Sequence, residues 1–161
     1  FKPTLIRSLV QTNGRGTMGK KWISKKGNLF ITIFFKINQQ KINFKQYALL
    51  NAYLFKNIIK KFTKNKIDIK WPNDLLVEKK KICGILQEVV EYNNDNYLIT
   101  GIGINTFVAP RNERFISTCL NNHTQKIIKN VKIIKNLKIA YEKMINDLNN
   151  NNFTYVKNKY I

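Results

Sequence analysis

The chain has 161 residues, of which 43% are hydrophobic, so it is long enough to bury the core of a single globular domain. It contains no run of eighteen or more apolar residues and no secretory leader pattern, which argues against a membrane protein and against a secreted one. The formal net charge of +20 would favour a polyanionic partner, but the excess is almost entirely lysine spread along the whole chain. We therefore expect a cytoplasmic protein with no membrane partner.

The first part of the chain predicts two strands followed by a helix. Residues 4–10 are β-rich, and residues 28–37 form a near-continuous run of β-branched and aromatic residues, typical of a strand buried on both faces. Residues 44–64 predict an amphipathic helix, because apolar residues recur there at steps of three and four. The residues that form this stripe are Tyr47, Leu50, Leu54, Ile58 and Phe62.

The second part predicts further strands and a second helix. Four β-rich stretches alternate with turn-forming residues, and they cover 66–71, 74–78, 81–92 and 97–104. Residues 127–148 keep a helical period, and an asparagine run then ends the helix before a short tail. The order of elements favours an α+β fold with a mixed, largely antiparallel sheet and helices packed on one side.

Residue types that often bind metals are few and scattered. Cys83 and Cys119 lie far apart and match no metal-ligand spacing, so we expect reduced thiols. The single histidine, His123, is expected at the surface rather than as a ligand. Cysteine and histidine therefore give no indication of a metal centre.

A glycine-rich segment, QTNGRGTMGKKW at residues 11–22, joins the first two strands. Its three glycines alone indicate only a sharp turn or a close approach of the backbone. Arg15, Lys20 and Lys21 lie in the same segment, and backbone N–H groups together with cationic side chains can cradle a phosphate or a carboxylate. Trp22, which closes the segment, either stacks on a flat ring or fills the core.

An acid and a base flank the next candidate turn. Asp74 follows the Trp-Pro-Asn bend at 71–73, and Lys81 begins the following strand across a polar turn. A hairpin of this length can bring the two side chains to one rim. Most charged residues at such turns are solvated surface, so this pair indicates a site only together with its neighbours.

Glycines also interrupt two strand patterns, where they weaken the strand. Gly84 lies in the middle of one predicted strand, and Gly101 and Gly103 lie on one face of another. Such placements often mark the close approach of a ligand to the backbone. Asn105 offers an amide at the end of the second strand. Together with the glycine-rich segment, these openings predict one cleft.

In their order and spacing, four blocks resemble the catalytic domain of biotin-protein ligases. The blocks are QTNGRGTMGKKW, KWPNDLLV, KICGIL and GIGIN, and the resemblance is strong over residues 5–105. It implies a fold like that of class II aminoacyl-tRNA synthetases. It also implies that residues 1–161 are a single catalytic domain, a fragment without the upstream strand and helix and the C-terminal SH3-like domain of the family.

The resemblance implies a two-step reaction. Biotin and ATP, with Mg²⁺, give biotinyl-adenylate and pyrophosphate, and a lysine of a carboxylase carrier domain then takes the biotinyl group. Attack of a carboxylate on the α-phosphorus brings two anions together, so it needs fixed positive charge. The resemblance assigns the catalytic roles to Lys81, Arg15 and Asp74. Asp74 is expected either to accept or position the proton of the carrier amine or to bind the metal.

Binding roles follow from the same resemblance. The residues implied in biotin binding are Gln11, Gly14, Arg15, Lys81, Gly84, Leu86, Gly101 and Gly103. Those implied in binding ATP or the adenylate are Gly16, Gly19, Lys20, Trp22 and Asn105. A homodimer is compatible with the sequence, which does not fix the oligomeric state.

Two alternative functions remain open. Lipoate ligases and octanoyltransferases share the implied fold, although the glycine segment ending in Trp22 and the block at 70–74 fit the biotin branch better. A basic nucleic-acid-binding module would gather lysines on one face with aromatic rings between them for stacking. Here the aromatic residues fall mainly at core-periodic positions, so nucleic acid is not expected as a partner.

Overall fold

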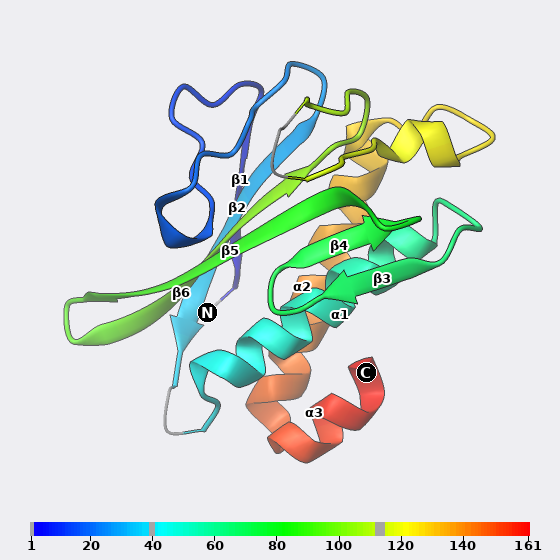
Figure 1. Cartoon of the computed structure of the whole chain (residues 1–161). Coiled ribbons are helices and arrows are strands. Elements are labelled where there is room, and N and C mark those ends of the chain that lie inside the picture. Colours follow the sequence, from blue (N-terminus) through cyan, green and yellow to red (C-terminus); the bar gives the residue numbers. More distant parts are fainter. Residues whose placement is uncertain (1, 39–40, 112–114) are drawn as a thin grey trace.

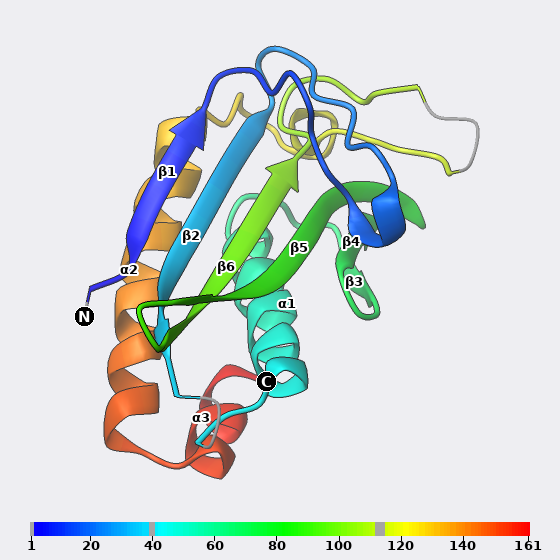
Figure 2. The same ribbon diagram turned by 90° about the vertical axis from the view of Figure 1, so that its left-hand side faces the viewer.

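One antiparallel sheet of six strands organises the protein in a computed structural model, which describes residues 2–38, 41–111 and 115–161. The strands are arranged in the order β1-β2-β6-β5-β4-β3, and each neighbouring pair is antiparallel (Figures 1 and 2). Their bounds are Thr4–Ser8 (β1), Leu29–Ile37 (β2), Ile67–Lys70 (β3), Asp74–Val77 (β4), Lys80–Tyr92 (β5) and Asp95–Ile104 (β6). The predicted α+β class with a largely antiparallel sheet is confirmed.

Two long helices cover one face of this sheet. Helices α1 (Phe44–Lys60) and α2 (Asn130–Asn150) lie behind the strands in Figure 2, whereas residues 11–22 lie on the other side of the sheet (Figure 1). A capping box fixes the start of α1, because Asn43 accepts a hydrogen bond from the Gln46 N–H while the Gln46 side chain accepts one from the Asn43 N–H. Because both helices lie on one face of the sheet, the other face is left for the glycine-rich segment.

The core lies between the sheet and the two helices. Side chains alternate across a strand, and on β2 the odd-numbered residues from Leu29 to Ile37 are all buried in this core. Beyond Phe30, the even-numbered residues of β2 are only partly buried, so the prediction of burial on both faces holds for the start of the strand alone. The aromatic rings of Phe35, Phe55 and Tyr141 pack at tilted or edge-on angles in the core.

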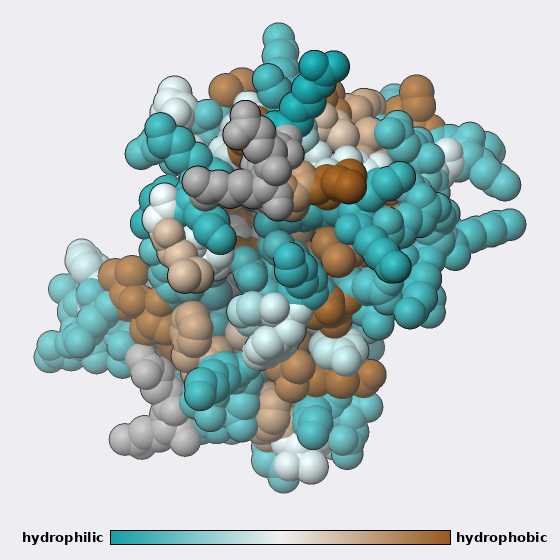
Figure 3. Space-filling model, viewed as in Figure 1, coloured by the Kyte–Doolittle hydropathy of each residue, from teal (hydrophilic) through white to brown (hydrophobic). Residues whose placement is uncertain are grey.

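The outer surface is mainly hydrophilic on the face shown in Figure 3, with apolar residues in small groups between the polar ones. Among the described residues, no helix is both long and apolar enough to cross a membrane. Of the two aromatic residues in the predicted helical stripe, Tyr47 is buried in the core, as predicted, and Phe62 is partly buried against it.

A third helix, α3 (Phe153–Tyr160), forms where the sequence predicted only a short tail. The asparagine run that ends α2 also caps α3, because the Asn152 side chain accepts a hydrogen bond from the Tyr155 N–H at 2.9 Å. Val156 is fully buried, and Asp147 of α2 accepts hydrogen bonds from Lys159 at 2.9 Å and from the Tyr160 hydroxyl at 2.8 Å. Eight residues with one buried anchor carry too weak a period to be recognised from sequence.

These contacts predict that the attachment of α3 is sensitive to acid. Burial would raise the pKa of the Asp147 carboxyl, but hydrogen bonds from Lys159 and Tyr160 outweigh burial and hold that pKa below its ordinary value. A carboxyl whose pKa is lowered by folding stabilises the fold above its unfolded pKa of about 3.9. That contribution disappears as the pH falls through the lower folded pKa.

We therefore expect Asp147→Asn to lower the urea midpoint of unfolding at pH 7, and we expect the difference from the unmodified protein to shrink in acid. Urea titrations at pH 7, 5 and 3, followed by far-UV circular dichroism, measure this. Asp68→Asn is the matched control, because Asp68 makes an ion pair with Lys66 at the surface, where such pairs contribute little. A midpoint difference for Asp147→Asn that is the same at pH 3 and at pH 7 would contradict the assignment.

Candidate functional site

A pocket of about 190 Å³ opens on the sheet face that the helices leave free. It is lined by the glycine-rich segment, by β5 and β6, and by Asn105, Pro110 and Phe115 from the chain that follows β6. Segments far apart in the sequence therefore meet at one place. The predicted cleft between the glycine-rich segment and the two glycine-interrupted strands is present.

Backbone hydrogen bonds fold the glycine-rich segment into a closed loop. The Trp22 N–H donates to the Gly14 carbonyl at 2.8 Å, and the Gly16 N–H donates to the Lys20 carbonyl at 2.6 Å. A Cβ atom at Gly14 would lie 2.6 Å from the Trp22 carbonyl oxygen, so only glycine allows the first of these closures. At the tip, Gly19 has a φ of 69°. The segment therefore behaves as one compact unit and not as a flexible hairpin.

The Trp22 indole lies flat against the backbone of two paired strands. Gly84 of β5 and Gly103 of β6 are direct partners across the sheet. A Cβ atom built on Gly84 would lie 2.5 Å from the indole Cζ3, and one built on Gly103 would lie 2.3 Å from Cε2. Both distances are shorter than any carbon contact tolerates, so the two glycines make the floor on which the indole rests. At Gly101 a Cβ atom would meet only Leu86, at 3.7 Å.

Lys81 is held next to this indole by an acid and two rings. Its Nζ lies 2.7 Å from Asp74 Oδ1, and the two side chains are only 14% and 16% exposed. The same Nζ lies 5.3 Å from the centre of the Trp22 ring and 5.0 Å from that of Phe115. The predicted meeting of Lys81 with Asp74 at one rim is confirmed. Sequence reasoning missed Phe115, which lies in an irregular segment without periodicity.

Cys83, between Lys81 and the glycine floor, faces the opposite way. It is fully buried in the core on the face opposite Gly84, because a register shift against Leu75 and Leu76 of β4 interrupts the alternation that would otherwise place it on the same face as Lys81. Burial raises the pKa of the Cys83 thiol, and the nearby Asp74 carboxylate raises it further. The thiol therefore stays protonated and is not available as a nucleophile.

Asn105 is buried at the end of β6 and already uses its amide. Its Nδ2 donates to the carbonyl oxygen of Thr118 at 3.2 Å, and its Oδ1 accepts from Asn28 Nδ2 at 3.4 Å. These bonds fix the chain that follows the sheet against β2 and β5. The Asn105 Oδ1 accepts one hydrogen bond here and can accept a second, for example from a ligand, without loss of these contacts.

Arg15 extends from the loop to the sheet. Its two terminal nitrogens donate to the two carboxylate oxygens of Glu88, on β5, at 3.0 and 2.7 Å. Sequence reasoning did not single out Glu88, because nothing in its strand pattern separates it from an ordinary outward-facing polar residue. At the start of the loop, Gln11 accepts a hydrogen bond from Ser24 at 2.9 Å.

The pocket brings together most of the residues that the sequence predicted. Those that line it are Gln11, Arg15, Gly16, Lys20, Trp22, Lys81, Gly84, Leu86, Gly101, Gly103 and Asn105. Gly14, Gly19 and Asp74 are not part of the lining: the two glycines shape the loop, and Asp74 contacts Lys81 from outside. Among the described residues, no group of three His, Cys, Asp or Glu side chains is placed to hold a metal ion.

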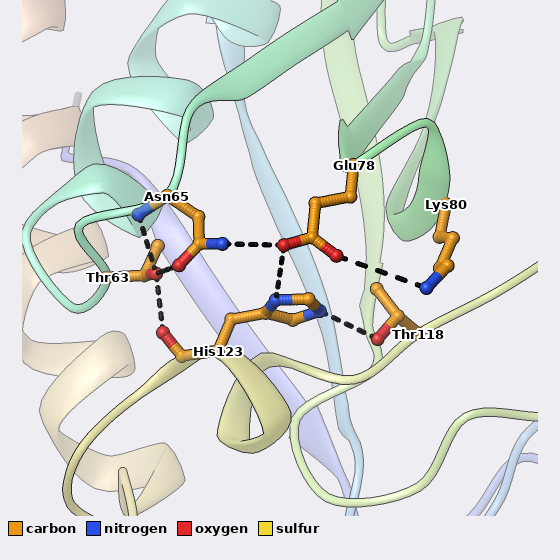
Figure 4. Close-up of polar contacts among 6 residues, drawn as sticks. All are labelled: Thr63, Asn65, Glu78, Lys80, Thr118 and His123. Carbon is orange, nitrogen blue, oxygen red and sulfur yellow. Dashed lines mark hydrogen bonds and ion pairs between the residues drawn. The ribbon is translucent and has the colours of Figure 1, made fainter.

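A second polar network, drawn in Figure 4, is connected to the site through Thr118. His123, predicted at the surface, has a side chain that is only 8% exposed, and its Nε2 lies 2.8 Å from the Thr118 hydroxyl. The backbone N–H of Thr118 donates to the Lys81 carbonyl at 2.9 Å. On the other side of the ring, Nδ1 faces Glu78 at 4.0 Å. The prediction that His123 lies at the surface was wrong, and its contacts are to distant residues: the Thr63 hydroxyl, 60 positions earlier, donates to the His123 carbonyl at 2.6 Å.

Comparison with known proteins gives a consistent set of relatives. Residues 2–105 match the model of the biotin/lipoate A/B protein ligase family. The chain is 31% identical over 160 residues to the bifunctional ligase/repressor BirA of Bacillus subtilis. The aligned region covers 96% of this chain and 49% of that protein. The chain is 33% identical over 97 residues to the bifunctional ligase/repressor BirA of Escherichia coli, and this aligned region covers 59% of this chain and 30% of that protein. The chain thus spans about half the length of the B. subtilis relative.

Solved structures with the same fold include biotin protein ligases. One is the Aquifex aeolicus enzyme in complex with biotin and ATP, with a TM-score of 0.79 and 26% identity over 97% of this chain and 66% of that chain. Another is the Leishmania major enzyme in complex with biotinyl-5-AMP. It has a TM-score of 0.78 and 23% identity, and the match covers 99% of this chain and 70% of that chain. A lipoate complex of Plasmodium falciparum LipL1 shares the fold more distantly, at a TM-score of 0.54 and 15% identity.

Proposed function

Because this chain belongs to the biotin/lipoate A/B protein ligase family, we propose that it activates biotin with ATP and transfers the biotinyl group to a lysine of a carrier domain. The observation that carries the proposal is the Lys81 ammonium, 5.3 Å from the Trp22 ring that rests on the glycine floor. A fixed cation beside a flat aromatic ring fits an anhydride of a carboxylic acid and a nucleotide. The Aquifex aeolicus relative, which binds biotin and ATP, supports this choice.

In the first step the biotin carboxylate attacks the α-phosphorus of ATP, and pyrophosphate leaves. The reacting oxygens bring negative charge together. Three cationic side chains of the pocket lining can stabilise that charge: Lys81 on β5, and Arg15 and Lys20 on the loop. The ammonium of Lys81 needs no reorganisation, because Asp74 already holds it at 2.7 Å. We assign to Lys81 the contact with the carboxylate and the α-phosphate.

The remaining pocket residues would bind the two halves of the intermediate. The Trp22 indole would move from its present seat to cover the adenine, and the vacated floor at Gly84 and Gly103 would receive the biotin rings. Leu86 and Gly101 would form the wall of that slot, and Asn105 would hydrogen-bond the adenine edge. The contacts of Gln11, Gly14, Gly16 and Gly19 would shape the loop that closes over both halves.

In the second step a carrier lysine attacks the acyl carbon, and AMP leaves. The attacking amine must lose one proton, and Asp74 is the carboxylate that lies beside Lys81 at the pocket rim. We propose that Asp74 aligns Lys81 in the first step and accepts or positions the amine proton in the second. An acidic carrier surface would suit a chain whose net charge is +20.

A protein-held magnesium ion does not fit the described residues. Asp74 is already paired with Lys81, and no cluster of three candidate ligands exists among the residues that the structure describes. Mg²⁺ commonly binds through the phosphates of a nucleotide with few protein ligands. We propose that Mg²⁺ enters with ATP, and no step above depends on a metal ligand from this chain.

The test is a direct assay of both steps. The protein is incubated with ATP, Mg²⁺ and labelled biotin, and biotinyl-adenylate is measured by thin-layer chromatography, then a biotin carboxyl carrier domain is added and its label is counted. We expect adenylate first and labelled carrier second. Parallel reactions with lipoate and octanoate are the controls, and preferential use of either acid would move the assignment to that branch of the family.

A further inference from the structure

Among the described residues that line the pocket, Glu88 is an acid to which the proposed reaction gives no role. Along β5, Gly84, Leu86 and Glu88 share one face of the strand, so Glu88 lies on the same side as the indole floor. Its carboxylate takes both hydrogen bonds of a paired contact with Arg15, at 3.0 and 2.7 Å. The two residues are 73 positions apart in the sequence. Glu88 therefore connects the neck of the loop, at Arg15, to the sheet.

The loop is attached to the sheet at two separate points. At its end, Trp22 rests on the glycine floor, and at its neck, where Arg15 pairs with Lys21, the Arg15 side chain reaches Glu88. Two backbone hydrogen bonds flank Arg15: the Trp22 N–H donates to the Gly14 carbonyl on one side, and the Gly16 N–H donates to the Lys20 carbonyl on the other. Because Arg15 lies between these closures, its contact with Glu88 holds the neck that carries the tip and not one side chain alone.

The contact leaves much of the guanidinium free. An arginine carries five N–H donors, and Glu88 accepts from one hydrogen of each terminal nitrogen. Both residues line the pocket, so donors that Glu88 does not use are available to an anion there. Lys20, Lys21 and Lys81 line the same pocket and keep its charge positive despite the carboxylate. Glu88 can orient Arg15 without repelling a phosphate.

We propose that Glu88 is a positioning residue: it orients Arg15, and with it the tip of the glycine loop, for the phosphate of the bound nucleotide. The proposal rests on the proposed function of the pocket. Ordering a long cationic side chain on a loop costs conformational freedom at the moment of binding, and a partner that orders it beforehand raises affinity. An exposed ion pair contributes little to overall stability, so its role lies in placement.

The experiment compares four variants of the whole chain: Glu88→Gln, Glu88→Ala, Arg15→Lys and the double variant Arg15→Lys/Glu88→Ala. We expect Glu88→Ala and Arg15→Lys each to speed hydrogen exchange in residues 11–22 and to raise the KM for ATP roughly tenfold, with a smaller change in kcat. Glu88→Gln should lie between Glu88→Ala and the unmodified protein. The double variant should be no worse than the worse single one, because both remove the same contact.

The matched control is Glu91→Gln, a change of the same type on the same strand but outside the pocket lining. It should change neither loop exchange nor KM. Unchanged exchange and KM in Glu88→Ala, tighter ATP binding, or additive effects in the double variant would each overturn the proposal. Failure of the unmodified protein to form any adenylate would count against the proposed function, whereas the exchange measurement would still decide whether Glu88 holds the loop.

Discussion

Lys81→Ala is expected to lower the rate of biotinyl-adenylate formation by roughly a hundredfold or more. The ammonium lies between Asp74, at 2.7 Å, and the rings of Trp22 and Phe115, at 5.3 and 5.0 Å from its Nζ. A cation in such a low-exposure setting stabilises developing negative charge far more than one in water. Removal of the ammonium also leaves the Asp74 carboxylate facing the anionic reactants, so two effects act in the same direction.

Single-turnover formation of the adenylate, measured with labelled biotin and saturating ATP, checks this result. Lys80→Ala is the matched control: Lys80 is the preceding residue, its side chain is 45% exposed, and it faces Glu78 at 3.9 Å. Lys81→Arg keeps the charge and tests whether position matters as well. Circular dichroism and a urea titration establish that each variant is folded, since a buried carboxylate without its partner can cost stability. Near-normal adenylate formation by a folded Lys81→Ala protein would remove Lys81 from the mechanism.

The same site shows which features a sequence can reveal. Gly84 and Gly103 could be predicted because they interrupt strand patterns, whereas Lys81 follows no unusual pattern and was assigned its role by the family resemblance. That the two glycines face each other could not be read from the chain, because it depends on the register between β5 and β6. For this reason the sequence could not decide whether the Trp22 side chain stacks on a flat ring or fills the core.

Contacts between segments that are distant in the sequence could not be predicted from it. Glu88 is one of several outward-facing polar residues of β5, and its meeting with Arg15 depends on how a loop 73 residues earlier folds back. Phe115 lies in a segment without period, and its ring became visible as a neighbour of Lys81 only in the fold. Long-range pairings of this kind leave no local pattern in one sequence.

Helix boundaries show the same limit on a smaller scale. The apolar stripe predicted a first helix to residue 64, whereas α1 ends at Lys60. Phe62 continues the period but lies beyond the helix, because Thr63 takes part in a turn in which its hydroxyl donates to the His123 carbonyl at 2.6 Å. The tertiary contact with a distant residue overrides local propensity at this end.

Gly103→Ala is expected to displace Trp22 from its seat and to weaken binding of the adenylate roughly ten- to a hundredfold, because the added methyl group would occupy the floor that the biotin rings would receive. The added Cβ would lie 2.3 Å from the indole Cε2 and 2.5 Å from Cζ2, and the ring cannot remain on the floor at such distances. The bonded loop that ends at Trp22 would then lose one of its two attachments to the sheet.

The seat of the indole can be followed by its own fluorescence. The protein has two tryptophans, and Trp71→Phe leaves Trp22 as the single emitter. In that background we expect Gly103→Ala to shift the emission to longer wavelength and to increase quenching by acrylamide. Gly101→Ala is the matched control for the seat, because Gly101 lies on the same strand as Gly103 and its Cβ would be 3.7 Å or more from its nearest neighbour, Leu86 of β5. If Gly103→Ala kept both the unmodified emission and full adenylate affinity, the two paired glycines would not be what holds Trp22 over the pocket.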